Sequence, residues 1–536
     1  MSTNNYSPQD RSNDGLQAAS SQRLLIKSTS IISIGTLSSR VFGFIRDVVL
    51  AKLLGTGLQA DAFFLAMKIP NLFRDLVGEG ATNAAIVPVA SEYLEHKKKE
   101  EFWAFVNIVF NWGLVILSVI TISGIVASPV IVWVIAPGFA WDPKKLELTI
   151  LLTRIMFPYL IFIGLTAYSA GILYTFRSFV VPSFTPCLLN IAIIMSAFIS
   201  SRFMEEPVFG LAVGVLVGGF LQLAAQIRPL VKIGMRYTKP IAFNHPGARK
   251  IGALIIPRIL GSGVYQLAVL IDSFCASMSF IIGPGGIAAI YYANRIISFP
   301  MGIFSVAMAS AALPALSGLV QKKDIEGFKK TVIFALENIF FVMCPNTIIL
   351  FVLSSPIIRV LFQRGEFGPY STNITALALS FYAIGLFAFG GVKMMVMVFY
   401  ALQDTKTPVK VAVLCLAINA ALNFILMYPL KVGGIALASS ISGIVNFLIL
   451  FYILDKRLEG LSSGLWEYFA RVLIASVMTG AVVFVAWERM VFPSEFMKLF
   501  VLGGSGFIFY GMVCLILKVE QAHKIFEWIK NVRRVK

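Results

Sequence analysis

The sequence predicts an all-α polytopic membrane protein with about 14 transmembrane helices, arranged as two six-helix lobes followed by two further helices. Of its 536 residues, 58% are hydrophobic and only 13% are charged, and its mean hydropathy is +0.83. A soluble domain is about half apolar and a quarter charged. Apolar runs longer than the roughly 20 residues that cross a bilayer recur from end to end. Several motifs of the first half also return in the second half.

Hydropathy places the expected spans along nearly the whole chain. We expect them at 24–53, 58–95, 101–126, 146–176, 184–202, 207–231, 250–281, 286–319, 328–354, 370–402, 407–428, 433–454, 466–487 and 497–518. Grouped into domains, the expected parts are a disordered polar tail (1–23), an N-lobe (24–232), a C-lobe (233–458), two final helices (459–519) and a basic tail (520–536).

Matching motifs indicate an internal repeat with both copies in the same orientation. Four pairs occur in the same order, at offsets between 218 and 230 residues. Transporters built from such repeats bind substrate near the membrane midplane, between the two halves. The pairs are SPVIVWVIAPGF (128–139) with SPIIRVLFQRGEF (355–367), RVFG at Arg40 with RILG at Arg258, the motifs ending at Pro70 and Pro300, and those at Pro186 and Pro408.

The distribution of Lys and Arg predicts that both termini are cytoplasmic. With the N-terminus inside, the inner loops and tails carry roughly 27 basic residues and the outer loops about 9. The net charge of +18 is then mostly an inner rim facing anionic lipid, and it requires no nucleic-acid partner.

Basic residues inside the expected spans point to function. Each costs about 2.5–3.5 kcal/mol at the bilayer centre, so it must snorkel, form an ion pair or face a watery cavity. Snorkelling or structural pairing explains those near span ends or without charged neighbours. These are Arg154, Arg258, Lys393 and Arg471.

The first span is harder to explain, because Arg40 and Arg46 lie well inside it. Asp47 returns to nearly the same helix face as Arg40, so an Arg40–Asp47 ion pair is one explanation, which leaves Arg46 unmatched.

Span 2 and the second lobe add further charged residues. The second lobe contributes Arg295, and span 2 contributes Asp61, Lys68, Arg74, Asp75 and Glu79. Guanidinium groups bind phosphate well at low dielectric, which predicts a transporter with a cationic cavity for a phosphorylated anion. Alternatively, these charges only join the two bundles.

A second group of polar residues suggests a cation site. Asp272 lies in span 7, Asn419 and Asn423 lie four apart on one helix face, and Ser439 in span 12 adds a hydroxyl group. One carboxylate with amide and hydroxyl oxygens suits Na+ as a coupling ion, and we expect no other cofactor. The alternative is ordinary hydrogen bonding between helices.

The chain has no P-loop, HExxH or GxSxG motif, so we do not expect an enzyme.

These motifs resemble the bacterial MurJ (MviN) lipid II flippase family, of the multidrug/oligosaccharidyl-lipid/polysaccharide exporter superfamily. The resemblance covers almost the whole chain after residue 24. It is carried by SRVFGFIRD, DAFFLAMKIPNLFRDLVGEGA, APGF, YYANRIISFP, LFQRGEF and QDTKTPVK.

The resemblance implies a 14-helix inner-membrane protein that carries an undecaprenyl-linked peptidoglycan precursor from the cytoplasmic to the periplasmic leaflet by alternating access. The last two helices are implied to form a groove for the lipid tail, and other cell-wall synthesis proteins are implied as partners. The implied substrate-binding residues are Arg40, Arg46, Asp47, Asp61, Arg74, Glu79 and Arg295, and the implied sodium ligands are Asp272, Asn419, Asn423 and Ser439.

The chain departs from the family pattern at three positions. Some members have aspartate at the position of Asn294, a second basic residue at that of Asp75, or a carboxylate at that of Asn423.

Three other functions stay open: a flippase for another undecaprenyl-diphosphate-linked oligosaccharide, a drug/cation antiporter and a membrane scaffold. The excess of Arg argues against an antiporter, whose cavity should be acidic or aromatic, and a scaffold needs no arginine in mid-membrane.

Overall fold

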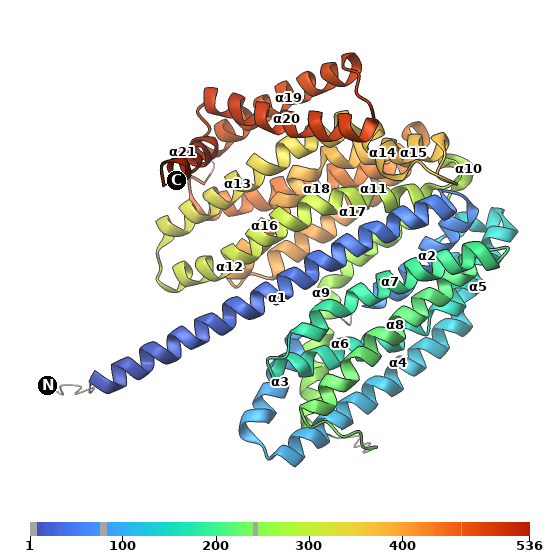
Figure 1. The fold of residues 1–536 in the computed structure, drawn as a ribbon, viewed down its shortest axis with the longest axis vertical. Coiled ribbons are helices and arrows are strands. Elements are labelled where there is room, and N and C mark those ends of the chain that lie inside the picture. Colours follow the sequence, from blue (N-terminus) through green and yellow to red (C-terminus); the bar gives the residue numbers. More distant parts are fainter. Residues whose placement is uncertain (1–7, 75–82, 240–244, 462–463, 536) are drawn as a thin grey trace. The chain divides into compact units, whose positions relative to one another are not determined.

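A computed structural model describes residues 8–74, 83–239, 245–461 and 464–535 (Figure 1). Every regular element in these ranges is helical, which confirms the predicted all-α class. The helices are α1 (Pro8–Leu54), α2 (Leu58–Arg74), α3 (Asn83–His96), α4 (Lys99–Ile135), η2 (Pro137–Trp141), α5 (Pro143–Met156), α6 (Tyr159–Thr175), α7 (Val180–Phe203), α8 (Pro207–Lys232), α9 (Pro246–Ala276), α10 (Ser279–Ile282), α11 (Gly286–Pro300), η3 (Met301–Ser305), α12 (Val306–Gln321), α13 (Ile325–Val352), α14 (Ser354–Phe362), α15 (Pro369–Ile384), α16 (Leu386–Ala401), α17 (Lys406–Leu430), α18 (Val432–Leu458), α19 (Leu465–Arg489), α20 (Glu495–Ile516) and α21 (Glu520–Val535).

Within the described residues, 10 helical segments are long and apolar enough to cross a membrane, or 11 if α15 and α16, bent by 48°, form one span. The chain is therefore a multi-pass membrane protein. The predicted spans that fall outside this set are those of α1, α2–α3 and α9. They carry the charged residues Arg46, Arg74 and Asp272, so apolarity alone does not confirm the predicted number of 14.

Contacts divide the chain into two compact units. Unit 1 comprises Met1–Leu50, Ala66–Pro129 and Ile150–Leu260, and unit 2 comprises Ala51–Leu65, Val130–Thr149 and Gly261–Lys536. Two stretches of the first half thus belong to the unit that contains the second half. The lobe boundaries expected at residues 232 and 458 stay a prediction.

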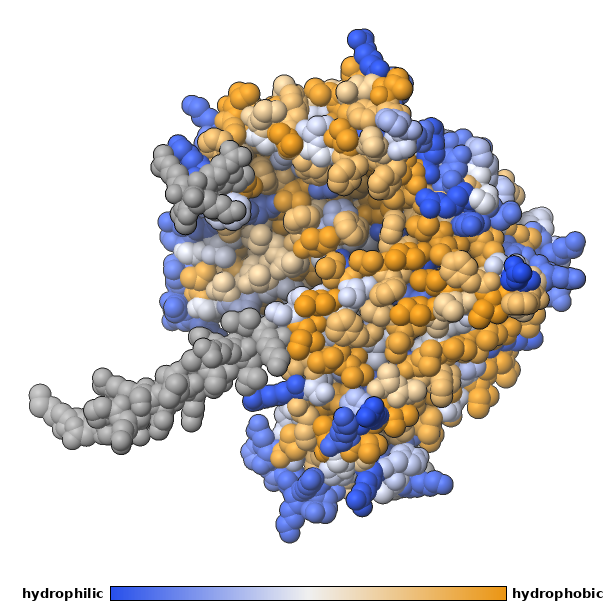
Figure 2. Space-filling model, in the orientation of Figure 1, coloured by the Kyte–Doolittle hydropathy of each residue, from blue (hydrophilic) through white to orange (hydrophobic). Residues whose placement is uncertain are grey.

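Each unit is a bundle in which helices pack along much of their length. In unit 1, α8 packs against α6 and α7, and in unit 2, α18 packs against α15 and α17. Small residues allow close approach, as in other membrane bundles. For example, a Cβ atom at Gly218 of α8 would lie 2.9 Å from the Leu189 Cα atom of α7. Figure 2 shows hydrophobic side chains along the visible helices and hydrophilic ones gathered near helix ends.

The first helix begins earlier than the sequence analysis expects. Residues from Pro8 to 23, predicted as part of a disordered tail, form the first turns of α1 in the structure. After Pro8 this segment contains only one glycine and no further proline to interrupt a helix. Residues 1–7 lie outside the described ranges.

The loop between α16 and α17 is fixed by Asp404. Its carboxylate accepts hydrogen bonds from the Thr407 backbone N–H (2.9 Å) and hydroxyl group (2.6 Å), and pairs with Arg457 (2.7 Å). The hydrogen bonds from Thr407, followed by Arg457, lower the pKa of Asp404 to about 2. A lowered pKa stabilises the fold above the ordinary value of about 3.9. This stabilisation is lost progressively as the pH falls from the ordinary value to about 2, so the loop stays capped at physiological pH.

The turn before α11 requires glycine, and Gly285→Ala should destabilise unit 2. Gly285 has φ +83°, and a Cβ atom there would overlap the Thr56 carbonyl oxygen. The left-handed conformation alone costs an L-residue about 1–2 kcal/mol. Thermal unfolding in detergent, followed by circular dichroism, should show a lower midpoint. Gly503→Ala is the control, because a Cβ atom at that position would meet open space within the described part of the chain. Equal midpoints for the two variants would contradict this prediction.

Candidate functional site

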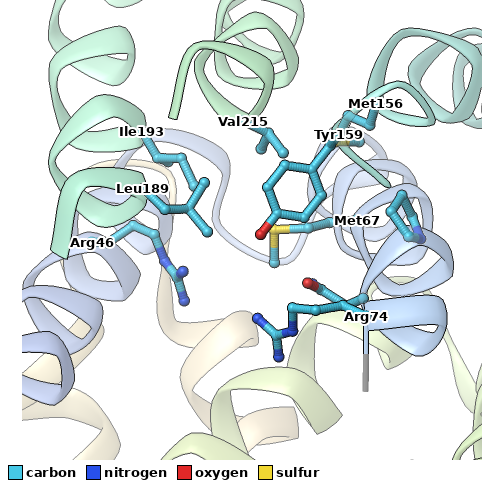
Figure 3. A pocket seen from close by; sticks show the side chains of 10 residues that line it. Arg46, Met67, Arg74, Met156, Tyr159, Leu189, Ile193 and Val215 are labelled. Carbon is cyan, nitrogen blue, oxygen red and sulfur yellow. The ribbon is translucent and has the colours of Figure 1, made fainter. Parts of the chain in front are cut away.

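Two arginines from different helices line one pocket in unit 1. Arg46 comes from α1 and Arg74 from the end of α2, and Figure 3 shows both guanidinium groups directed into the same space, with the Tyr159 hydroxyl group above them. The remaining lining residues come from α2, α5, α7 and α8. They are Met67, Pro70, Asn71, Met156, Leu189, Ile193 and Val215. The pocket therefore combines two cationic groups with an otherwise mostly apolar wall.

Arg46 is held in place by hydrogen bonds from both ends of its guanidinium group. Its Nε and Nη2 atoms donate to Asp47 Oδ1 at 3.0 and 2.7 Å, and its Nη1 atom donates to Asn190 Oδ1 at 2.9 Å. Asn190 in turn donates to the Ser39 carbonyl oxygen at 3.2 Å. Arg46 is 8% exposed and Asp47 is fully buried. These bonds fix the direction in which Arg46 faces the pocket.

The Arg40–Asp47 ion pair, one of the two explanations considered for the charges of α1, is not the pair that the structure shows. Asp47 pairs with its sequence neighbour Arg46, so Arg46 is not the unmatched residue of α1. The seven-residue spacing places the Cα–Cβ bonds of Arg40 and Asp47 on nearly the same helix face, but it does not determine where a long side chain ends. The Arg46 side chain is long enough to turn back onto the adjacent carboxylate, and Asn190 stabilises that conformation with a third hydrogen bond.

The pocket is small in this conformation. Its volume is about 40 Å³, which is room for about two or three water molecules. A sugar-linked diphosphate does not fit without movement of the surrounding helices. Charge-assisted hydrogen bonds from guanidinium groups are the interactions that bind phosphate oxygens most strongly, so the chemistry suits a diphosphate even though the volume does not.

Arg40 and Arg295, two other predicted substrate-binding residues, are not among the residues that line this pocket. Arg40 is half-buried on α1 in unit 1, and Arg295 is half-buried on α11 in unit 2. Glu79 and Asp75 lie outside the described residues. The structure therefore brings together Arg46, Asp47 and Arg74 of the predicted set.

Asp61 forms a separate buried ion pair in unit 2 with Lys145 of α5. Lys145 Nζ lies 2.5 Å from Asp61 Oδ2 and 4.2 Å from the centre of the Phe139 ring. Asp61 also accepts hydrogen bonds from the backbone N–H groups of Gly285 (3.2 Å) and Ala288 (2.9 Å). The carboxylate thus caps the N-terminus of α11, where the helix dipole favours negative charge.

This ion pair joins three segments that are far apart in the sequence. Asp61 belongs to 51–65, Lys145 to 130–149 and the capped helix to the second half, and all three belong to unit 2. Phe64 strengthens the same contact by stacking on Tyr291, with ring centres 4.0 Å apart. We call this group of Asp61, Lys145, Gly285 and Ala288 the α11 clasp.

The four residues of the predicted cation site do meet in unit 2. Asn423 Nδ2 donates to Asp272 Oδ1 (2.8 Å), and Ser439 Oγ donates to Asp272 Oδ2 (3.1 Å). Asn419 Nδ2 donates to Ser439 Oγ at 3.2 Å, and Asn419 Oδ1 accepts from Asn423 at 3.2 Å. The four side chains form a closed ring of hydrogen bonds. This is what the alternative to a cation site, ordinary hydrogen bonding between helices, predicts.

The same ring has oxygen atoms that suit a sodium ion. Asn423 Oδ1 is buried and has no hydrogen-bond partner within the described part of the chain. Rotation of the two amide groups would add their oxygens to the Asp272 carboxylate and the Ser439 hydroxyl group. A hard cation prefers such an all-oxygen set, so the residues present fit Na+.

Four basic residues inside the predicted spans were expected to snorkel or to form structural pairs, and three of them contact a polar, charged or aromatic side chain. Arg154 Nε donates to Ser128 Oγ at 3.0 Å, Arg471 pairs with Glu467, and Lys393 Nζ lies 5.9 Å from the centre of the Tyr265 ring. The side chain of Arg258 lies outside the described residues.

Sequence reasoning missed Asn190, Tyr159 and Lys145. Asn190 carries a weak signal, because it is an amide within the apolar stretch PCLLNIAI. Tyr159 lies in an aromatic-rich span, so nothing in the sequence distinguishes it from its aromatic neighbours. Lys145 follows Lys144 in a polar connection, so its burial had no signal in the sequence.

Comparison with known sequences shows similarity to one family over most of the chain. The family model described as lipid II flippase MurJ matches residues 50–504. The Vibrio cholerae serotype O1 protein named "Probable lipid II flippase MurJ" is 36% identical over 92% of this chain and 97% of its own length. The Burkholderia cenocepacia protein named "Lipid II flippase MurJ" is 33% identical over 85% of this chain and 88% of its own.

Comparison with solved structures agrees with the sequence matches. The structure titled "Lipid II flippase MurJ, inward closed conformation" matches with a TM-score of 0.77 and 27% identity, over 92% of this chain and 99% of its own. An inward-facing multidrug resistance MATE family transporter of the MOP superfamily matches with a TM-score of 0.65. It is 15% identical over 82% of this chain and 99% of its own, so it shows a shared fold alone.

Proposed function

The chain belongs to the lipid II flippase MurJ family, and from this premise we propose that it carries lipid II across the membrane by alternating access. It is a transporter and not an enzyme. In the proposed cycle, Arg46 and Arg74 bind the diphosphate of the head group on its way from the cytoplasmic to the periplasmic leaflet. The polyprenyl tail meanwhile stays in lipid.

The observation that carries this proposal is the convergence of Arg46 and Arg74 on one pocket. A guanidinium group inside a membrane bundle is costly, and Asp47 offsets this cost for Arg46. Both guanidinium groups are nevertheless directed into one pocket, as binding of a multivalent anion requires. Because the pocket holds only about 40 Å³ in this conformation, the proposed cycle requires that it widen when substrate enters and contract when substrate leaves. Asp47 and Asn190 keep Arg46 aligned throughout, so little side-chain entropy is lost on binding.

A flippase for another undecaprenyl-diphosphate-linked oligosaccharide is the alternative. Its substrate contains the same diphosphate as lipid II, so the arginine pocket does not distinguish the two substrates. Residues beyond this pocket must recognise the sugars and the peptide. The named relatives favour lipid II.

We assign the protein to the bacterial inner membrane, with both termini in the cytoplasm and membrane lipids around it. The excess of Lys and Arg in the predicted inner loops supports this orientation. We also propose α19 and α20, which pack against each other and on α13, as the surface along which the polyprenyl tail runs. Other cell-wall synthesis proteins are proposed partners.

The function is tested by depleting the native flippase of a host bacterium and supplying this chain. Growth should be rescued, and lipid II should reach the periplasmic leaflet, as measured by a leaflet-resolved chemical assay of labelled precursor. Accumulation of lipid II in the cytoplasmic leaflet despite normal amounts of the protein would refute the proposal. Rescue of a cell that lacks a different polyprenyl-diphosphate flippase, without rescue here, would favour the alternative.

Sodium coupling is proposed separately, through Asp272, Asn419, Asn423 and Ser439. When a sodium ion is bound, it supplies positive charge beside Asp272 and can bias one conformation over the other. Asp272→Asn should remove any thermal stabilisation of the purified protein by NaCl relative to KCl. It should also make lipid II transport independent of the sodium gradient. Identical sodium responses of wild type and Asp272→Asn would eliminate this site.

A further inference from the structure

The last helix, α21, has an apolar face that continues beyond the body of the protein. In its first turn, Gln521 and Ala522 are buried. Along the following turns, Ile525, Phe526 and Trp528 are 49%, 54% and 67% exposed. Ile525 lies one helical turn after Gln521 and Ala522, on the side of the helix that they bury. A covered face thus becomes an uncovered one within a single helix.

The start of α21 is fixed to unit 2. Gln521 Nε2 donates a hydrogen bond to Glu337 Oε2 of α13 at 3.1 Å, and α21 also packs against α20. Lys524 pairs with Glu520 at 2.6 Å and lies 5.5 Å from the centre of the Phe334 ring. The exposed turns therefore have a set direction relative to α13 and α20.

The position of α21 in the chain places it at the membrane surface. α20 is one of the membrane-crossing helices and ends at Ile516. Only Leu517, Lys518 and Val519 separate it from Glu520, where α21 begins. At 1.5 Å rise per residue, the first turns of α21 cannot leave the headgroup region. Trp528, exposed in these turns, is a residue type enriched at that depth.

The charges of this segment are complementary to anionic lipid. From Glu520 onward the sequence contains two acidic residues, Glu520 and Glu527, and five basic residues, which are Lys524, Lys530, Arg533, Arg534 and Lys536. Each Lys or Arg near an anionic surface contributes about 1 kcal/mol to binding. An amphipathic helix with a basic polar side and exposed aromatic residues is typical of interfacial anchors.

We infer that α21 is a membrane-surface helix that buries Ile525, Phe526 and Trp528 below the headgroups and binds anionic lipid through its basic residues. This surface is distinct from the arginine pocket and does not depend on the proposed transport function. It fixes the C-terminus beside α13 and α20.

Site-directed spin labelling of the full-length protein tests this inference. Trp528→Cys and its neighbour Glu527→Cys are labelled with a nitroxide in vesicles of phosphatidylcholine and phosphatidylglycerol. The native cysteines are all buried, so the introduced thiol is the accessible one. At position 528 the ratio of collisions with oxygen to collisions with an aqueous nickel complex should be several-fold higher than at position 527. Lys524→Glu combined with Lys530→Glu should lower that ratio at position 528.

Three outcomes would overturn the inference. Equal exposure of both positions to the nickel complex would place α21 in water. A label at position 528 that neither reagent reaches would indicate contact with a second copy of the chain or another protein. The same depth in vesicles of phosphatidylcholine alone would remove the role of anionic lipid.

Discussion

Arg74→Ala and Arg46→Lys should each abolish rescue of a flippase-depleted cell while the amount of protein in the membrane stays normal. Arg74→Ala removes one of the two guanidinium groups that line the pocket. Arg46→Lys keeps the positive charge beside buried Asp47 but loses the planar fork that bonds Asp47 and Asn190 together. A charge-assisted hydrogen bond contributes about 1.5–3 kcal/mol. Loss of one bond should therefore weaken binding of the diphosphate about 10- to 100-fold.

The choice of substitution at Arg46 decides what the experiment means. Arg46→Ala removes the Arg46 partner of the buried Asp47 carboxylate, and breaking a buried ion pair typically costs about 3–5 kcal/mol and can prevent folding. Arg46→Lys avoids that ambiguity. Arg471→Ala is the matched control, because Arg471 is an arginine of a spanning helix that is only half-buried and pairs with Glu467. It should rescue growth fully. Full rescue by both Arg74→Ala and Arg46→Lys would contradict a role of this pocket in substrate binding.

Lys145→Met should destabilise unit 2 by about 3–5 kcal/mol, the typical cost of removing one partner from a buried ion pair. Asp61 would remain fully buried with a negative charge and without its cationic partner, although two backbone N–H groups and the dipole of α11 would still stabilise it. The neighbouring variant Lys144→Met is the control, because Lys144 is exposed and has the same charge and size. Thermal unfolding of the purified proteins should show a clearly lower midpoint for Lys145→Met alone.

A double variant separates charge from packing at the α11 clasp. Asp61→Asn combined with Lys145→Met removes both charges and keeps an amide oxygen that can accept the Ala288 N–H bond. Its stability should lie closer to wild type than that of Lys145→Met, because no buried charge is left unpaired. If Lys145→Met is as stable as Lys144→Met, the clasp does not stabilise the fold.

The clasp also bears on the transport cycle. It binds the stretches 51–65 and 130–149, which come from the first half of the sequence, to a helix of the second half. A transporter built from two repeats alternates by moving one repeat against the other. We therefore expect the clasp to open and re-form during each cycle, which requires that its net stabilisation be modest compared with the binding energy of the substrate.

Much of the fold follows from simple features of the sequence. Long apolar runs predict membrane helices because an uninterrupted helix satisfies its own backbone hydrogen bonds in lipid. Three predicted spans, those of α1, α2–α3 and α9, are not among the described segments long and apolar enough to be identified as membrane-crossing, and they carry the candidate residues Arg46, Arg74 and Asp272. The interleaved units had no signal in the sequence, because they depend on contacts between segments such as Asp61 and Lys145.

The candidate sites were predictable to different degrees. Arg46 and Arg74 could be identified because a charge inside a span is costly and needs an explanation. The meeting of Asp272 with Asn419 and Asn423 followed from helix periodicity and the likeness to relatives. The alternative that paired Asp47 with Arg40 was wrong, because side-chain flexibility allowed the adjacent Arg46 to reach the carboxylate. Lys145 was missed, because nothing local distinguishes it from Lys144.

The central claim is that Arg46 and Arg74 together bind the diphosphate of lipid II during transport. The most direct measurement is the rate at which purified protein in vesicles moves labelled lipid II between leaflets, for wild type, Arg74→Ala, Arg46→Lys and Arg471→Ala. We expect wild type and Arg471→Ala to transport at similar rates, and the two pocket variants to transport about 10- to 100-fold more slowly when lipid II is not saturating. Equal rates for all four proteins would show that the diphosphate is bound elsewhere.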